Sequence, residues 1–146
     1  MASVEPKFYG TATVLVKHHA RHAPSASVNV KAMFKIKRTT DPPESGDGFR
    51  VLIDRVWPRD VKKTEVSMDL WLKEIAPSTE LGQWFAHNPE KWEEFQRRYA
   101  RELDTWPQLT TLLKVESADG PVTLLYFASD PEHNQAVALK AYLQTD

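Results

Sequence analysis

The feature of the sequence that most constrains its fold is a nearly continuous apolar run at residues 121–129, PVTLLYFAS. A strand with one exposed face alternates apolar and polar residues, and this run does not. Strands covered on both faces are typical of parallel sheets with helices above and below them. The run therefore predicts a central strand of an α/β fold, a three-layer domain with a small, mostly parallel sheet.

Two further strands are predicted earlier in the chain. Alternation of Phe34 and Ile36 with lysines indicates a strand that ends at Lys37 and Arg38, and FRVLID at 49–54 alternates in the same way. The segment between them, TTDPPESGDG, is rich in proline, glycine and acidic residues and is predicted to be a loop. Because this loop is short, the two strands could form an antiparallel hairpin or run parallel.

Helical periodicity predicts five helices after residue 66. In the first, an apolar stripe recurs at i, i+3, i+4 and i+7, formed by Met68, Trp71, Leu72 and Ile75. The predicted caps or first residues are Ser67, Ser78, Asn88 followed by Pro89, Pro107, and Ser129 or Asp130 followed by Pro131.

The length of 146 residues, with 41% hydrophobic and 27% charged residues, favours a single domain, which we expect over residues 33–146.

Residues 1–32 are more basic and hold three histidines, and we expect an irregular extension or a start codon placed upstream of Met33. A basic leader peptide is a weaker alternative. If this segment is ordered, TATVLV at 11–16 would add an edge strand. The spacing of His18 and His22 is too weak to predict a metal site.

The composition excludes several classes of function. There is no cysteine, so disulfides and thiolate chemistry are excluded. No run reaches the roughly eighteen apolar residues of a membrane span, so we expect a cytoplasmic protein without membrane contact. A net charge of −1 argues against general nucleic-acid binding. Neither a glycine-rich phosphate loop nor a nucleophile-elbow serine occurs.

Polar residues follow each predicted strand. In an open parallel sheet, ligands bind at the carboxyl ends of the strands, so these residues would meet in one crevice if all three strands are parallel. The candidate ligand-binding residues are Arg38, Asp54, Arg55, Trp57, Arg59, Ser129 and Asn134, and the candidate acid or base is His133. The arginines could hold a carboxylate or phosphate with two hydrogen bonds, and Trp57 could stack on a ligand.

Each candidate also has a purely structural interpretation. Arg55 could pair with Asp54 or with a helix carboxylate, Trp57 could belong to the core, and His133 could lie in water at a helix start.

Long strings of the chain resemble the YeaO-like branch of domain-of-unknown-function family 488. They are RVLIDRVWPR, DLWLKEIAPS, WFAHNPEKWEEFQRRYAREL and TLLYFASDPEHNQAVAL, and the similarity covers about three quarters of the chain, from Met33 to about Leu143. The resemblance implies a Rossmann-like parallel sheet and an uncharacterised activity, and it favours parallel first strands.

The polar signature of that family falls on Asp54, Arg55, Trp57, Pro58 and Arg59, and on His133 and Asn134. Asp60 departs from it, because the family pattern has glycine there; an acid at this position could pair with Arg59 and weaken anion binding.

The sequence thus predicts a protein that binds a small anionic or planar ligand at the strand ends. The alternatives are a hydrolase or transferase that uses His133, and a non-enzymatic interaction protein or a haem- or metal-binding protein that uses His87 or His133. The sequence identifies no cofactor and is compatible with a homo-oligomer.

Overall fold

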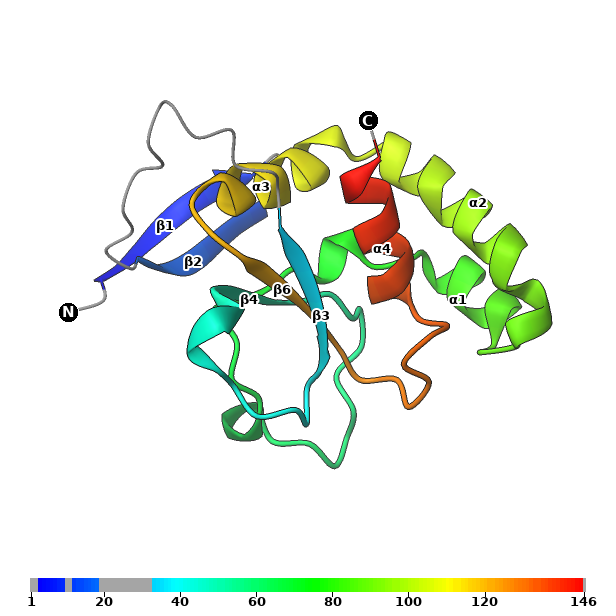
Figure 1. The fold of residues 1–146 in the computed structure, drawn as a ribbon, viewed down its shortest axis with the longest axis horizontal. Helices are drawn as coiled ribbons and strands as arrows, with labels where there is room; N and C mark the ends of the chain where they lie inside the picture. Colours follow the sequence, from blue (N-terminus) through cyan, green and yellow to red (C-terminus); the bar gives the residue numbers. More distant parts are fainter. Residues whose placement is uncertain (1–2, 10–11, 19–32, 146) are drawn as a thin grey trace.

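A computed structural model describes residues 3–9, 12–18 and 33–145, with side chains described from residue 33 onward. Its main feature is a four-stranded sheet with the order β3-β6-β4-β5 (Figure 1). The strands are β3 (Phe34–Arg38), β4 (Phe49–Leu52), β5 (Leu70–Trp71) and β6 (Val122–Tyr126). Every pairing among them is parallel, which confirms the predicted α/β class with a small parallel sheet.

The strand β6 lies between β3 and β4 and pairs in parallel with both. The hairpin alternative for the first two strands is therefore wrong, and the carboxyl ends of β3, β4 and β6 lie at one edge of the sheet. All five residues of β6 are buried, as its unbroken apolar sequence predicts.

The turn before β4 depends on Gly48, whose φ is 65°. A Cβ atom at this position would lie 2.0 Å from the carbonyl oxygen of Pro121. The close approach allows the N–H of Phe49 to donate to that same oxygen at 3.0 Å. Only glycine fits here, since it lacks the Cβ and adopts positive φ without strain.

Four α-helices follow, α1 (Thr79–Phe85), α2 (Trp92–Asp104), α3 (Pro107–Ala118) and α4 (Gln135–Gln144). The predicted cap of α1 is confirmed, because the Ser78 hydroxyl accepts a hydrogen bond from the N–H of Leu81. Asn88 caps the 3₁₀ turn η4 (Pro89–Lys91), which leads into α2. Pro107 is the first residue of α3, also as predicted.

The helix predicted from Ser67 to Ala76 is wrong. This segment contains β5 and the 3₁₀ turn η3 (Lys73–Ile75), and a further 3₁₀ turn, η2 (Lys63–Glu65), precedes it. Backbone hydrogen bonds to β4 replace helical ones, with Asp69 N–H donating to Arg50 O and Leu72 N–H to Leu52 O, both at 2.8 Å. Pairing with the sheet therefore outweighs the local helical periodicity.

The last helix begins later than predicted. Neither Ser129 nor Asp130 caps it and Pro131 is not its first residue; α4 begins at Gln135, and the Asn134 side chain accepts from the N–H of Val137. Asp130 instead stabilises the preceding turn, accepting from the N–H groups of Glu132 and His133. A side-chain-capped turn can hold proline as readily as a helix start can, so the sequence pattern fits both.

Residues near the N-terminus form a hairpin of β1 (Ser3–Tyr9) and β2 (Ala12–His18), which pair antiparallel in a separate two-stranded sheet. A strand does lie in the TATVLV segment, but its partner is β1 and not an edge of the main sheet. The two strands also differ from the irregular extension expected for residues 1–32. The side chains of His18 and His22 lie outside the described ones.

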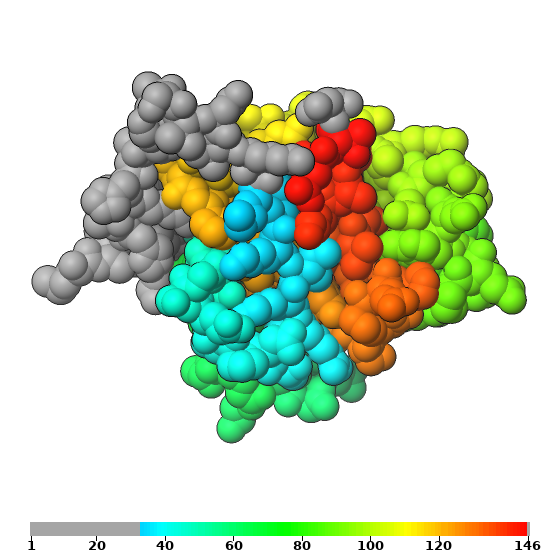
Figure 2. Space-filling view, in the orientation of Figure 1, coloured from blue at the N-terminus to red at the C-terminus, as the bar shows by residue number. Residues whose placement is uncertain are grey.

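The helices and loops cover opposite faces of the sheet. Phe49, Val51 and Ile53 point to one face, where they share a single hydrophobic core with side chains of α1, α2, α3 and α4. Leu52 and Leu125 are also buried but lie outside that core, because they point to the other face. In Figure 2, β3 lies beside α4, and the loop that follows β3 extends away from that helix.

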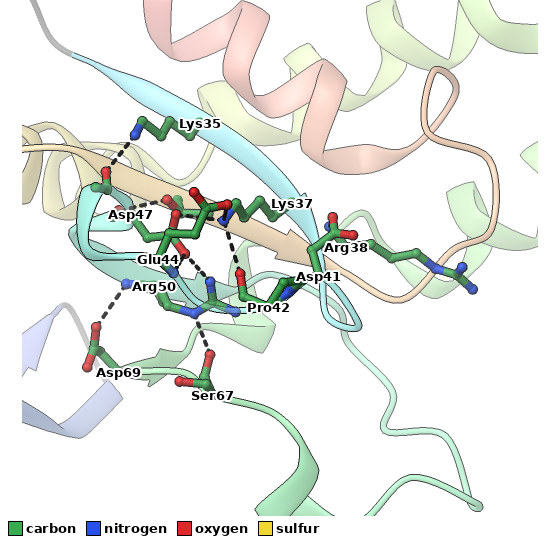
Figure 3. A network of polar contacts seen from close by, with 12 residues as sticks. Lys35, Lys37, Arg38, Asp41, Pro42, Glu44, Asp47, Arg50, Ser67 and Asp69 are labelled. Carbon is green, nitrogen blue, oxygen red and sulfur yellow. Dashed lines mark hydrogen bonds and ion pairs between the residues drawn. The ribbon is translucent and has the colours of Figure 1, made fainter.

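A group of charged residues, which we call the Asp47 cluster, fixes the loop after β3 to that second face (Figure 3). It consists of Lys37, Glu44, Asp47 and Arg50. The Asp47 carboxylate pairs with the Arg50 guanidinium and, at 2.9 Å, with the Lys37 ammonium, and the Asp47 carbonyl accepts from Thr123 at 2.7 Å. The 3₁₀ turn η1 (Ser45–Asp47) is thereby held against β3, β4 and β6.

Candidate functional site

A pocket of about 380 Å³ lies beyond the carboxyl end of β4, and we call it the β4-end pocket. Its walls come from residues 54–56 after β4, residues 76–79 at the start of α1, the rings of Phe85 and Phe95, and Gln135 at the start of α4. Pockets at strand carboxyl ends are the usual ligand sites of open α/β sheets. The volume is near the lower end of the roughly 300–1,000 Å³ typical of small-molecule sites, so the pocket suits a small ligand.

Asp54 lies between the end of β4 and the start of α4. One carboxylate oxygen accepts from the N–H of Phe127 at 3.1 Å, and the other accepts a short hydrogen bond from the side-chain amide of Gln135. Burial raises the pKa of Asp54 to about 6, even though the Phe127 N–H lowers it. The backbone carbonyl of Asp54 accepts from the Trp71 indole at 2.7 Å, which fixes the backbone at this point.

Arg55 is held by backbone carbonyl groups. Its Nε donates to Pro77 O at 3.2 Å and its Nη2 to Ala76 O at 3.0 Å, which links the end of β4 to the start of α1. Among the described residues no carboxylate lies within ion-pair distance of this guanidinium, and its Nη1 has no hydrogen-bond partner there. Arg55 therefore keeps its charge and unused N–H groups beside the pocket.

Contacts with α2 fix the α1 side of the pocket. The Glu102 carboxylate accepts from both the backbone N–H and the hydroxyl of Ser78, at 2.8 and 2.5 Å. The buried hydroxyl of Tyr99 donates to Ile75 O at 2.7 Å, and burial raises its pKa well above the ordinary value. The rings of Phe85 and Phe95 stack at 4.3 Å between centroids and form an apolar wall.

Two of the candidate residues, Trp57 and Arg59, lie outside the lining of the pocket. The Trp57 indole donates to Val61 O at 2.6 Å, and its ring packs edge-on against Trp71 and Phe127, each 5.3 Å away. Arg59 is exposed, and no ion pair joins it to Asp60 in the part of the chain that the structure describes.

Arg38 also lies apart from the pocket, at the end of β3. Its Nε donates to Phe127 O at 3.4 Å. Figure 3 shows its side chain pointing away from the Asp47 cluster.

The candidates after β6 belong to the turn that precedes α4. Asn134 is almost fully buried, caps α4 and donates to Asp130 O at 2.9 Å, so its side chain is used structurally. His133 Nδ1 lies 2.9 Å from the Asp130 carboxylate, and its ring packs edge-on against Trp92. Ser129 is exposed. None of these three lines the β4-end pocket, although Ala128 does.

The structure therefore brings Asp54 and Arg55 together in one pocket and places the other candidates elsewhere. The pocket-lining residues that sequence reasoning missed include Gln135, Phe85 and Phe95. Gln135 was hidden by the misplaced start of the last helix, and the two phenylalanines have the spacing of ordinary core residues.

Across residues 33–145, no group of three or more histidine, aspartate or glutamate side chains is arranged to hold a metal ion. No helix in the described part of the chain is long and apolar enough to cross a membrane.

Residues 33–146 match a protein-family model described as the inactive DUF488-N3 subclade. The chain is also similar to the uncharacterized protein YeaO of Escherichia coli, with 40% identity over 109 residues, which cover 75% of this chain and 95% of YeaO. The uncharacterized protein Rv3073c of Mycobacterium tuberculosis is 38% identical over 91 residues, 61% of this chain and 77% of that protein. No solved structure gives a significant match.

Proposed function

The chain belongs to the DUF488 family, in its inactive N3 subclade, and from this premise we propose that the β4-end pocket binds a small anionic ligand with a planar or apolar body. The observation that carries the proposal is that Arg55 lines the pocket and has no carboxylate partner among the described residues. A guanidinium that lines a pocket and is held only by carbonyl groups keeps a positive charge that an incoming carboxylate or phosphate can pair with.

The geometry around Arg55 supports a preformed site. The hydrogen bonds to Ala76 and Pro77 use two of the guanidinium donors and fix its orientation, so a ligand would not have to order a flexible side chain. Because charge-assisted hydrogen bonds strengthen when water is excluded, a half-buried arginine is a better anion receptor than an exposed one. Arg59, which is exposed and outside the pocket, lacks both advantages.

The body of the ligand would contact the apolar wall. Phe85 and Phe95 present stacked rings to the pocket, and Pro77 and Ala128 add apolar surface. Ligand pockets usually combine such surface with a few polar groups that set orientation. A flat or compact apolar group next to an anionic group matches this lining better than a free inorganic ion does.

Binding without turnover is the form of the proposal that the observations favour. The matching family model is described as inactive, and His133, the candidate acid or base, packs on Trp92 outside the pocket lining. A hydrolase or transferase would require another titratable group at the ligand, and His87 at the pocket is the alternative for that role. The haem- or metal-binding alternative has no comparable support.

We expect Arg55→Gln to weaken the binding of 3-phenylpropionate by about 10- to 100-fold, the usual cost of one lost charge-assisted interaction. Isothermal titration calorimetry with benzoate, 3-phenylpropionate and inorganic phosphate would measure the effect. The matched control is Arg59→Gln, which removes the same charge outside the pocket and should change affinity by less than about threefold.

Because Arg55 also links two segments, circular dichroism must first show that the variant is folded. Equal losses in the two variants, or the absence of binding of all three probes to the wild-type protein, would overturn the proposal.

A further inference from the structure

We propose that the ligand of the β4-end pocket is a small zwitterion, whose anionic group pairs with Arg55 and whose ammonium or similar N–H donor binds Asp54 and Gln135. This inference rests on the proposed function and adds the chemical class of the ligand.

The first observation is that the pocket holds two opposite charges that are not paired with each other. Asp54 and Arg55 are adjacent in sequence and both line the pocket, yet no ion pair within 4.0 Å joins them in the described chain. Asp54 is held by the segment after β6 and by α4, whereas Arg55 is held by the segment before α1. A ligand with both charges would complement two separated partners at once.

The second observation is an excess of hydrogen-bond acceptors on the Asp54 side. Each Asp54 oxygen accepts one hydrogen bond, whereas a carboxylate offers about four acceptor sites. The side-chain oxygen of Gln135 also has no hydrogen-bond partner among the described residues. An ammonium group has three donors and no acceptor, so it fits this side of the pocket better than a second anion would.

Within residues 33–145, no cationic side chain forms an ion pair with Asp54. Arg55 and His87 line the pocket with Asp54, and Tyr99 on α2 lies close enough for the Asp54 charge to raise its pKa. The contacts from the segment after β6 and from α4 come from the uncharged Phe127 and Gln135. The pKa of this carboxyl, raised by burial to about 6, shows the consequence, because a paired carboxylate would have a lowered pKa. At pH 7.5 the group is ionised, and a ligand ammonium would supply its missing partner.

The size and walls of the pocket complete the description. The volume of about 380 Å³ suits a molecule of amino-acid size, and Phe85 and Phe95 provide a surface for an apolar side chain. The predicted class is therefore a small α-amino acid or similar zwitterion with an apolar or aromatic side chain.

The test uses matched probes that differ by one charged group. For the aromatic series they are L-phenylalanine, 3-phenylpropionate without the ammonium, and phenethylamine without the carboxylate. For the aliphatic series they are L-leucine, 4-methylpentanoate and 3-methylbutylamine. Calorimetric titrations at pH 7.5 should show one of the amino acids binding at least about tenfold more tightly than both of its analogues.

Variants assign the two charged ends. Asp54→Asn should reduce the preference for the amino acid over its deaminated analogue to about twofold or less, and the matched control Asp60→Asn should leave the preference unchanged. Arg55→Gln should instead reduce the preference over the decarboxylated analogue.

The outcomes separate the two proposals. If the carboxylates bind as tightly as the amino acids, the zwitterion inference is wrong and the anion site stands. If no amino acid or carboxylate binds, both fail. A preference for the amino acid that survives Asp54→Asn also contradicts the inference, since the ammonium would then bind elsewhere.

Discussion

Replacing Asp47 by alanine is expected to lower the free energy of unfolding by about 3–5 kcal/mol, the usual cost of removing one partner of a buried ion pair. The Asp47 and Arg50 side chains are only 3% and 6% exposed. Without the carboxylate, the Arg50 guanidinium would remain buried with Ser67 O as its remaining hydrogen-bond acceptor. Its Nη2 already lacks a partner among the described residues, so little is available to compensate.

Urea denaturation followed by circular dichroism would measure this loss. The control is Glu44→Gln, because Glu44 also pairs with Lys37 but its side chain is 69% exposed, and it should cost less than about 1 kcal/mol. Equal effects of the two substitutions would show that the Asp47 cluster does not hold the loop to the sheet.

The Asp47 cluster also predicts a pH dependence. Burial opposes ionisation, but hydrogen bonds from Lys37, the Glu44 N–H and Arg50 outweigh it and lower the pKa of Asp47 from 3.8. A lowered folded-state pKa gives stability that is present above the unfolded pKa and is lost as pH falls through the folded one. The contribution of Asp47 should therefore persist to pH 4 and disappear only in stronger acid.

Replacing Asp54 by asparagine is expected to raise the free energy of unfolding by about 1–3 kcal/mol above pH 6, whereas Asp47→Ala lowers it. The folded-state pKa of about 6 exceeds the ordinary 3.8, so between these values the folded protein binds a proton that the unfolded chain does not. The free energy of unfolding then falls as pH rises from about 4 to 6. Above pH 6 the folded protein bears the full cost of burying the ionised Asp54 carboxylate. The upper limit follows from about 1.4 kcal/mol for each pKa unit.

Asparagine can keep the local contacts, because its oxygen can accept from Phe127 N–H while its amide donates to a flipped Gln135 side chain. The measurement is the free energy of unfolding of both proteins at several pH values between 4 and 8. The difference should be small near pH 4 and reach its full size above pH 6. A difference that does not change with pH would contradict the raised pKa of Asp54.

A carboxyl group that reduces stability at neutral pH needs a reason other than folding. Ligand sites commonly contain groups whose burial costs stability because binding requires them. A measured cost at Asp54 would therefore support a functional interpretation of the β4-end pocket, whereas the ion pairs of the Asp47 cluster have a structural role.

The sheet could be predicted because its central strand carries an unambiguous signal. The apolar run at 121–129 has no polar face, and it forms the fully buried β6. The alternation in 49–54 predicted one buried face, yet Arg50 and Leu52 are buried as well. The second face of β4 is covered by a distant loop through Asp47, and local periodicity contains no information about that contact.

The candidate site could be anticipated only in part, for a similar reason. The rule that ligands bind at strand ends drew attention to Asp54 and Arg55, and both line the β4-end pocket. It also expected Trp57 and Arg59 there, but both lie outside the pocket lining, and the Trp57 indole donates to Val61 O instead. The path of an irregular loop depends on such tertiary hydrogen bonds, which sequence spacing does not reveal.

The most direct test of the central claim is a crystal structure of the protein soaked with the tightest-binding of the amino acid and carboxylate probes. The structure is expected to show the ligand carboxylate about 3 Å from the Arg55 guanidinium, with the apolar body against Phe85 and Phe95. A ligand bound elsewhere, with the β4-end pocket unchanged beside Asp54 and Arg55, would contradict the claim.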